Sequence, residues 1–263
     1  MKTNKLFAVW TGLVLFFLLF PFVVIVYASF SNSAQVGVPL SNPGFGAYLD
    51  IFDKSRYLKS LTLSLQVAFF ATLIGVVMGT LASFVIVRKR YVKIVAVINN
   101  LLLAPLMVPM VITGIALMVS ISNVGITMTK PLLILVHSVI VLPYVVRTVC
   151  ATLSNFDASM EEAALVLGAK PWRTLWEISI PNIRSGIVTG AILGFISSFG
   201  EVIVTTFILP IGMTTLPVEI LNTLLYNFSP SIASISALVS FIIFAALIIL
   251  FQFFPSAFVE SQN

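Results

Sequence analysis

A succession of apolar runs, each long enough to cross a lipid bilayer as a helix, restricts the fold of this chain more than any other feature. We count six runs, at about 6–30, 61–87, 94–120, 132–153, 185–209 and 232–254. A hydrocarbon core about 30 Å thick requires about 20 apolar residues of helix. The runs are too long and too continuous for the strands of a membrane barrel. The sequence therefore predicts an all-α membrane protein with six transmembrane helices.

Composition agrees with a bilayer environment, since 59% of the residues are hydrophobic and only 9% are charged. A soluble domain has about a quarter of its residues charged. The net charge of +5 does not indicate a nucleic-acid partner, because the basic residues lie in short loops beside apolar spans, next to membrane lipid. The single cysteine, Cys150, excludes an intrachain disulfide and a cysteine zinc cluster, and we interpret it as a helix-packing residue.

The distribution of Lys and Arg predicts the orientation of the spans. Ten of the fourteen lie in the N-terminus, the 88–93 turn and the segment 147–184, and four lie in the alternate loops. By the positive-inside rule both termini are cytoplasmic. We divide the chain into an N-terminal anchor helix and extracytoplasmic loop (1–60), a transmembrane core domain (61–254) and a cytoplasmic tail (255–263). The first run exceeds the 7–15 apolar residues of a signal peptide, which favours an uncleaved anchor.

One polar passage, "EEAALVLGAKPWRTLWEISIP" (161–181), interrupts the apolar runs on the cytoplasmic side. Four apolar residues at helical spacing form one face of a short helix: Met160, Ala163, Ala164 and Leu167. Asp157 or Ser159 can cap its start, and Ser159 with Glu162 fits a capping box. Gly168 is well placed to adopt the left-handed conformation that ends a helix. Pro171 suits the first turn of a second helix, whose face carries Trp172, Leu175 and Trp176, and Pro181 is expected to close the unit.

Two short amphipathic helices of this kind either rest on the lipid interface, where Trp is common, or bind a protein. Anionic lipid would repel the acidic polar face of the first helix, Glu161 and Glu162. The residues therefore favour a protein partner for the segment 157–181.

At these residues the chain resembles the permease subunits of bacterial ABC importers. Their cytoplasmic EAA motif reads Glu-Ala-Ala, three residues, Gly, nine residues, and Ile-x-Leu-Pro. Here Glu162-Ala163-Ala164, Gly168 and Ile178-Ser179-Ile180-Pro181 keep that spacing, with Ile180 in place of the usual Leu. The resemblance extends from about 60 to 254, and "NFSPSIASISALVSFIIF" (227–244) is similar to the last span of the spermidine/putrescine branch. Related branches carry opines, aminophosphonates, iron or thiamine.

The resemblance implies a permease in the bacterial cytoplasmic (inner) membrane that works with several partners. It would pair with a second permease, different in sequence in the polyamine-like branch, engage two copies of an ATP-binding subunit, and receive substrate from an extracytoplasmic binding protein. The coupling residues would be Met160, Glu161, Glu162, Ala163, Ala164, Leu167, Gly168 and Pro181. The chain carries no G-x-x-x-x-G-K-[ST] loop, so ATP and Mg are expected in the partner ATPase, with no cofactor here.

Glu201 is the most informative charge inside a predicted span. With Gly194, Ser197, Ser198 and Thr205 it is expected to share one helical face of the fifth run. A charge facing lipid at this depth costs about 2.5–3.5 kcal/mol, so it is expected to face the bundle interior or water. Two interpretations stay open: a substrate-pathway face of Ser197, Ser198, Glu201 and Thr205, or a structural hydrogen-bonding partner. Polyamine-type relatives often have two adjacent acids here, whereas this chain has Gly200 before Glu201.

Other polar residues in or beside the spans have less specific patterns. His137 lacks metal-ligand spacing, and we expect a hydrogen-bonded packing histidine rather than a metal or proton site. Arg147 is expected to extend towards the cytoplasmic face, with a gating salt bridge as the alternative. Asn99 and Asn100 are candidates for bonds across helices. The segment 214–231 is either a re-entrant or surface helix or a plain connector.

Two other classes of function compete with a transport subunit. A secondary transporter or channel ordinarily needs several intramembrane charges, and Glu201 stands nearly alone. An intramembrane enzyme needs a catalytic set, and the sequence offers no Ser-His-Asp group, paired acids or metal cluster. The sequence therefore predicts a transport subunit with no catalytic residues and no metal site.

Overall fold

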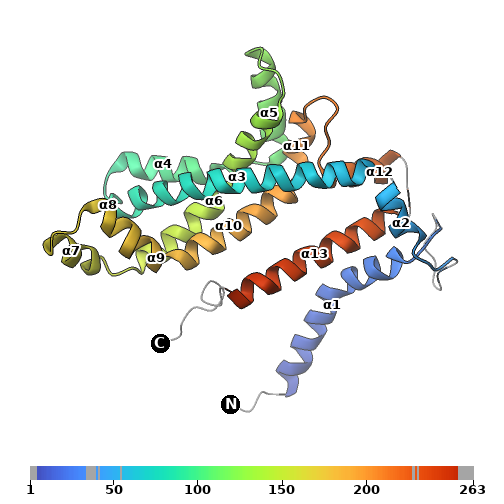
Figure 1. The fold of residues 1–263 in the computed structure, drawn as a ribbon, viewed down its shortest axis with the longest axis horizontal. Helices are drawn as coiled ribbons and strands as arrows, with labels where there is room; N and C mark the ends of the chain where they lie inside the picture. The colour runs from blue at the N-terminus through green and yellow to red at the C-terminus, as the bar shows by residue number, and fades with distance from the viewer. Residues whose placement is uncertain are drawn as a thin grey trace. The chain divides into compact units, whose positions relative to one another are not determined.

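The computed structural model describes residues 5–33, 40, 42–53, 55–226, 229 and 231–253. Within these residues the regular structure is helical, apart from one isolated antiparallel bridge between Ser31 and Pro43. This confirms the all-α prediction. The chain divides into two units, one of residues 1–60 and 219–249 and the other of residues 61–218 and 250–263 (Figure 1), and the predicted tail 255–263 lies outside the described residues.

Three helices in the described part are long and apolar enough to span a membrane. They are α1 (Lys5–Ser29), α3 (Ser55–Arg88) and α6 (Lys130–Ser154), and their positions agree with the first, second and fourth predicted runs. Two bent helix pairs raise the number to five if each pair forms one span. The last run corresponds to α13 (Ser231–Phe253), and the count of six stays a prediction.

The third predicted run, 94–120, is not a continuous helix. It consists of α4 (Lys93–Leu103), the short 3₁₀-helix η1 (Ala104–Leu106) and α5 (Met110–Asn123), and the two halves meet at an angle of 104°. Pro105 lies in η1 and Pro109 caps α5. Because proline lacks a backbone N–H and clashes with the preceding turn, the two prolines break the helix instead of only bending it.

The fifth predicted run, 185–209, is also interrupted. The helix α10 (Arg184–Phe199) ends one residue before Gly200, and a separate helix, α11 (Ile203–Ile208), follows. Glu201 lies in the break. The expectation that it shares a continuous helical face with Gly194 is therefore wrong, because the backbone leaves the helical path at Gly200–Val202.

Close backbone approaches hold α6 against its two neighbours in the second unit, α3 and α10 (Figure 1). A Cβ placed on Gly190 of α10 would lie 2.8 Å from the Val145 Cα and 2.5 Å from the Thr148 Oγ1. Gly186 and Gly194, one turn away on either side, meet α6 in the same way, as do Gly75 and Gly79 of α3. Small residues four apart allow membrane helices to pack backbone to backbone, and this pattern places α6 in the centre of the unit.

Two apolar clusters form the core of the second unit. One joins α3, α5, α6 and α11 through Leu63, Val67, Ile121, Leu133, Ile140, Val204 and Ile208. The other, the α6–α10 cluster, consists of Ala71, Phe84, Val141, Val145, Val149, Leu153 and Ile183, with Leu175 and Ile180 of the cytoplasmic passage packed against it. The second cluster therefore connects the spans with the segment that the sequence analysis singled out.

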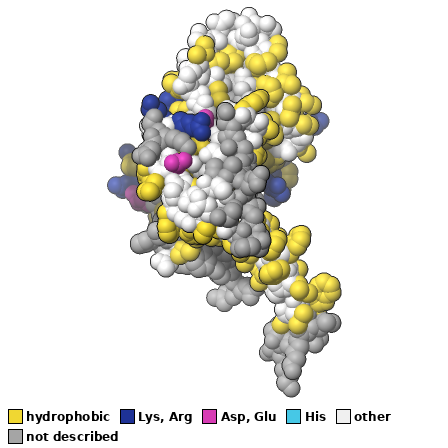
Figure 2. Space-filling view, turned by 90° about the vertical axis from the view of Figure 1, so that its right-hand side faces the viewer, with side chains coloured by type: hydrophobic (Ala, Val, Ile, Leu, Met, Phe, Trp, Pro, Cys, Tyr) yellow, Lys and Arg dark blue, Asp and Glu magenta, His cyan; other side chains and the backbone are white. Residues whose placement is uncertain are grey.

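In the first unit, α1 packs against α13. The Ser234 hydroxyl donates to the Ser29 carbonyl at 2.7 Å, and the Phe22 ring meets Phe241 and Phe244 edge to face. The outward side chains of α1 stay exposed, for example Phe17 at 77%. Figure 2 shows one face of the molecule, on which charged side chains are few and apolar ones are frequent. Apolar exposure of this extent fits contact with lipid.

Candidate functional site

The segment 157–181 begins with an aspartate whose side chain caps the first turn of a helix. The Asp157 carboxylate accepts the Ser159 backbone N–H at 2.9 Å, and α7 (Ser159–Val166) follows. This bond, with a smaller contribution from the Ser159 side chain, holds the pKa of the exposed Asp157 carboxyl below its ordinary value. Of the two expected caps, Asp157 is confirmed. The capping box of Ser159 and Glu162 is wrong, because Ser159 already lies within the helix and the N-cap residue is Ala158.

Gly168 ends α7 in the expected left-handed conformation, with φ at 88°. The Gly168 N–H donates to the Leu165 carbonyl at 3.0 Å, and the Ala169 N–H reaches back to Ala164 at 3.0 Å. These two bonds satisfy carbonyls that the end of the helix leaves without partners. A residue with a Cβ would be strained at this φ, so the glycine fixes the direction in which the chain leaves α7.

The second arm of the passage runs directly into the following span. Pro171 opens α8 (Pro171–Thr174), as predicted, and a π-helix, η2 (Leu175–Ser179), and α9 (Ile180–Asn182) continue it. Pro181 does not close the unit, because it lies inside α9. The wider η2 turn, in which the Ile180 N–H donates to Leu175, accommodates the missing proline N–H. The path then bends by 68° into α10.

One side of α7 is an exposed apolar surface, as the helical spacing predicted. The side chain of Met160 is 46% exposed and that of Leu167 is 88% exposed, while Ala163 is exposed and Ala164 half-buried. None of the α7 residues is buried. Trp172 and Trp176, at 59% and 62%, extend the apolar surface onto the second arm. A surface of this kind on a short polar segment is typical of a site that binds a partner.

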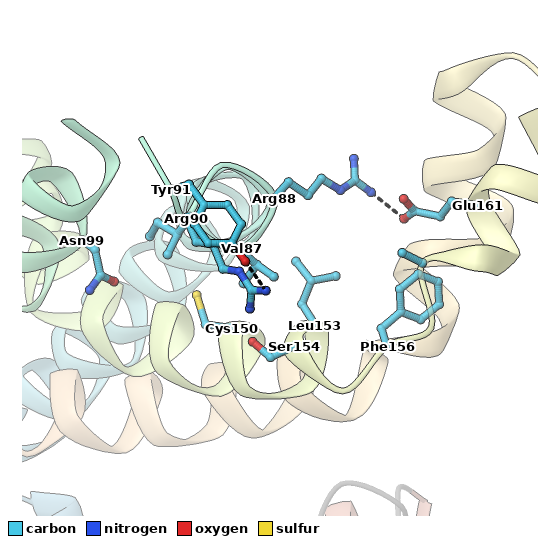
Figure 3. A pocket seen from close by; sticks show the side chains of 12 residues that line it. Val87, Arg88, Arg90, Tyr91, Asn99, Cys150, Leu153, Ser154, Phe156 and Glu161 are labelled. Atoms are coloured by element: carbon cyan, nitrogen blue, oxygen red, sulfur yellow. Dashed lines mark hydrogen bonds and ion pairs between the residues drawn. The ribbon is translucent and has the colours of Figure 1, made fainter. Parts of the chain in front are cut away.

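The two adjacent acids of α7 have different environments. Glu162 is exposed, whereas Glu161 is half-buried and points toward α3, where its Oε1 accepts the Arg88 Nη2–H at 2.5 Å (Figure 3). The hydroxyl of buried Ser179 donates to the same oxygen. The family resemblance placed Glu161 among the coupling residues, but in the structure its carboxylate bonds to Arg88 of α3 and to buried Ser179.

The side chain of Glu201 caps the N-terminus of the short helix α11. Its Oε1 accepts the Val204 N–H at 2.9 Å, and its Oε2 accepts the Thr205 N–H at 2.8 Å and the Thr205 hydroxyl at 2.7 Å. The residue is 9% exposed. Carboxylates stabilise helix N-termini because the first backbone N–H groups lack partners. In this arrangement the carboxylate has a structural role, which was one of the two interpretations left open.

His137 of α6 joins the same network. Its Nδ1 lies 2.8 Å from the Ser198 Oγ and its Nε2 lies 3.0 Å from the Thr205 Oγ1. Since the Thr205 hydroxyl has one proton and donates it to Glu201, the hydrogen between Thr205 and His137 belongs to the histidine Nε2, which donates to Thr205. The packing role expected of His137 is confirmed, but its link to Ser198 and Thr205 was not foreseen. Half-buried Ser197 forms no bond in this network.

The remaining candidates occupy separate positions. Arg147 is exposed and lines a cavity of about 530 Å³ with Leu106, Tyr144, Thr148, Ala151 and Leu193. Asn99 lines a second cavity, and within the described chain neither Asn99 nor Asn100 forms the expected bond across helices. The segment after Pro210 contains α12 (Leu216–Tyr226), whose Glu219 pairs with Arg56 at 3.4 Å.

In the described residues, apolar helices long enough to span a membrane, two interrupted spans and an exposed two-arm segment of short helices are the features of a multi-pass membrane protein. The family model described as "Binding-protein-dependent transport system inner membrane component" matches residues 71–260, and the chain belongs to this family. It is a permease subunit in the inner membrane, as the sequence predicted.

Individual relatives agree with the family. The chain is 28% identical to the spermidine/putrescine transport system permease protein PotC of Haemophilus influenzae, with 90% of this chain and 91% of that protein covered. It is 28% identical to the putrescine transport system permease protein PotI of Escherichia coli, with coverages of 85% and 81%. A bacterial ABC transporter involved in the import of the acidic polysaccharide alginate has a similar fold, with a TM-score of 0.70, 18% identity and coverages of 98% and 99%.

Proposed function

We propose that this permease subunit forms the substrate pathway of an ATP-driven importer and couples to a separate ATPase through residues 157–181. The exposed apolar surface of α7, which ends at the left-handed Gly168, is the observation that carries the proposal. Six spans with both termini in the cytoplasm, an anchor and loop at 1–60, a core at 61–254 and a tail at 255–263 complete the proposed topology.

Coupling would be mechanical. Met160, Ala163, Ala164 and Leu167 would insert into a cleft of the ATPase, with exposed Glu162 at the rim, while Glu161, Gly168 and Pro181 fix the shape of the segment. ATP and Mg would bind to two ATPase copies, which this chain does not contain. Because α9 runs into α10 through a single residue, Ile183, displacement of the docked segment would be passed to the fifth span. Differential contacts in two ATPase states would then shift the spans between inward-open and outward-open arrangements.

For the substrate, we propose a small cationic solute of the polyamine type, delivered by an extracytoplasmic binding protein. The names of the PotC and PotI relatives support this class. Ser197, Ser198, Glu201 and Thr205 remain the proposed pathway residues. A pathway role requires that Glu201 exchange its present donors, the Val204 and Thr205 N–H groups, for ammonium groups of the substrate when the break between α10 and α11 opens. Opines, aminophosphonates, iron and thiamine are the alternative substrates.

Co-expression with candidate ATPases and a second permease tests the proposal. A tag on this chain is expected to co-purify the ATPase, and Glu162→Lys and Gly168→Asp are expected to abolish both co-purification and uptake. The second variant strains a backbone whose φ is 88°. Lack of an ATPase in the wild-type preparation, together with normal uptake by both variants, would exclude this function and favour a secondary transporter or channel. Binding assays on the cognate extracytoplasmic protein identify the substrate.

A further inference from the structure

Glu161 connects three segments of the second unit through one carboxylate oxygen. The Arg88 guanidinium at the end of α3 donates to Oε1 of this α7 residue (Figure 3). The Ser179 hydroxyl of η2 donates to the same oxygen. In the chain, 73 residues separate Arg88 from Glu161 and 18 separate Glu161 from Ser179. The contact is therefore tertiary, and it joins both arms of the cytoplasmic segment to the second span.

The Arg88 side chain packs against an aromatic residue of the core. Its guanidinium carbon lies 4.7 Å from the centre of the Phe84 ring, one turn earlier on α3. Phe84 is buried and belongs to the α6–α10 cluster, which also contains Val145 and Ile183. A continuous series of contacts thus runs from α7 through Glu161, Arg88 and Phe84 to the helices that contain the proposed pathway.

The ion pair lies where α7 itself has no buried residue. Within the described residues, α7 packs against α8 and η2 of the second arm. Next to the ion pair lies a cavity of about 580 Å³, lined by α3 and α6 residues that include Val87, Cys150, Leu153 and Ser154, together with Arg88 and Glu161. The second arm differs, because Leu175 and Ile180 pack directly against the α6–α10 cluster.

We propose that Arg88 and Glu161 are positioning residues that transmit the movement of α7 to the end of α3 during transport. The proposal rests on the function proposed above, in which α7 docks to an ATPase. Because the Arg88 side chain is 48% exposed, solvent screens the ion pair and its contribution to folding stability is small. Its hydrogen bonds nevertheless fix the distance between α7 and α3, so a displacement of one helix moves the other.

Variants of the pair test this role in the complete complex in liposomes. Arg88→Ala and Glu161→Gln are expected to retain the ATPase and to hydrolyse ATP, while putrescine uptake per ATP falls about tenfold. The exchange of charges, Arg88→Glu with Glu161→Arg, is expected to restore part of the coupling. Arg90→Ala is the matched control and is expected to transport normally. Among the described residues, Arg90 bonds to the adjacent Tyr91 hydroxyl at 2.8 Å and does not contact α7 through a hydrogen bond or ion pair.

A second measurement does not depend on the substrate. In a Cys150→Ser background, spin labels at exposed Lys89 and Leu135 report the movement of the α3 end relative to α6. Addition of an ATP analogue is expected to change this distance in the otherwise wild-type complex and not in Arg88→Ala. An equal change of this distance in the otherwise wild-type complex and in Arg88→Ala overturns the inference. Loss of the ATPase from the Arg88→Ala complex, while the wild-type complex retains it, also overturns the inference. A wild-type chain that binds no ATPase instead refutes the proposed function.

Discussion

Replacement of Glu201 distinguishes a structural role of its carboxylate from a role in contact with substrate. Its three hydrogen bonds, at 2.9, 2.8 and 2.7 Å, begin α11. Hydrogen bonds inside a bilayer contribute about 0.6 kcal/mol on average and about 1.7 at most. Glu201→Ala loses all three bonds and is expected to lower the free energy of unfolding by about 2–5 kcal/mol. In Glu201→Gln the amide oxygen can retain both Thr205 bonds while its NH₂ group faces the Val204 N–H, so the loss is about 1 kcal/mol.

Unfolding of the purified permease in graded SDS measures these losses, and uptake in cells measures the function. Glu201→Ala is expected to reduce uptake while leaving the ATPase bound, since α11 lies apart from the cytoplasmic segment in the sequence. Ser197→Ala is the control, because half-buried Ser197 takes no part in the network. Full stability of Glu201→Ala would refute the capping role. Full stability of Glu201→Gln together with lost uptake would show that transport requires the charge itself.

Three further perturbations test other parts of the structure. Gly190→Ala introduces a Cβ 2.8 Å from the Val145 Cα and is expected to lower the free energy of unfolding in the SDS assay by about 1–3 kcal/mol. Gly12→Ala is the control, because a Cβ there meets nothing within 4 Å, and it is expected to change the free energy of unfolding by less than about 0.5 kcal/mol. Deletion of 158–180 is expected to abolish both ATPase co-purification and uptake. Since the folded-state pKa of Asp157 is lowered, its cap is fully present above the ordinary carboxyl pKa and is lost as the pH falls through the lowered value. Hydrogen exchange at the Ser159 amide is therefore expected to show less protection only in strong acid, and Asp157→Ala to show the low protection at every pH.

Local signals in the sequence predicted several turns and helix ends of the segment 157–181. Asp157, Gly168 and Pro171 act as expected because caps, left-handed glycines and first-turn prolines depend on the backbone within a few residues. Pro181 was misinterpreted for the opposite reason. The neighbouring turn accommodates its missing N–H by widening into η2, and no local rule predicts this.

Continuity of the spans was predicted less well, because apolarity alone does not show where a helix breaks. Pro105 and Pro109 lie at the break in the third run, but a proline can either bend or interrupt a membrane helix, and the sequence does not show which. At the fifth span Gly200 was the available signal, and the Glu201 cap that stabilises the new helix became visible only in three dimensions. The spacing of Gly186, Gly190 and Gly194 was a further signal, missed in the sequence, for the contact with α6.

By itself the sequence determined the membrane environment, the helical class, the position of the segment 157–181 along the chain and the family that the chain resembles. These follow from the length of apolar runs, the placement of charges and short-range motifs, all of which can be read along the chain. Only the tertiary structure decided that Glu161 faces Arg88 while Glu162 faces outward, and that His137 meets Ser198 and Thr205. Such pairs join residues up to 73 positions apart. They depend on how the helices pack, and a one-dimensional pattern does not encode this packing.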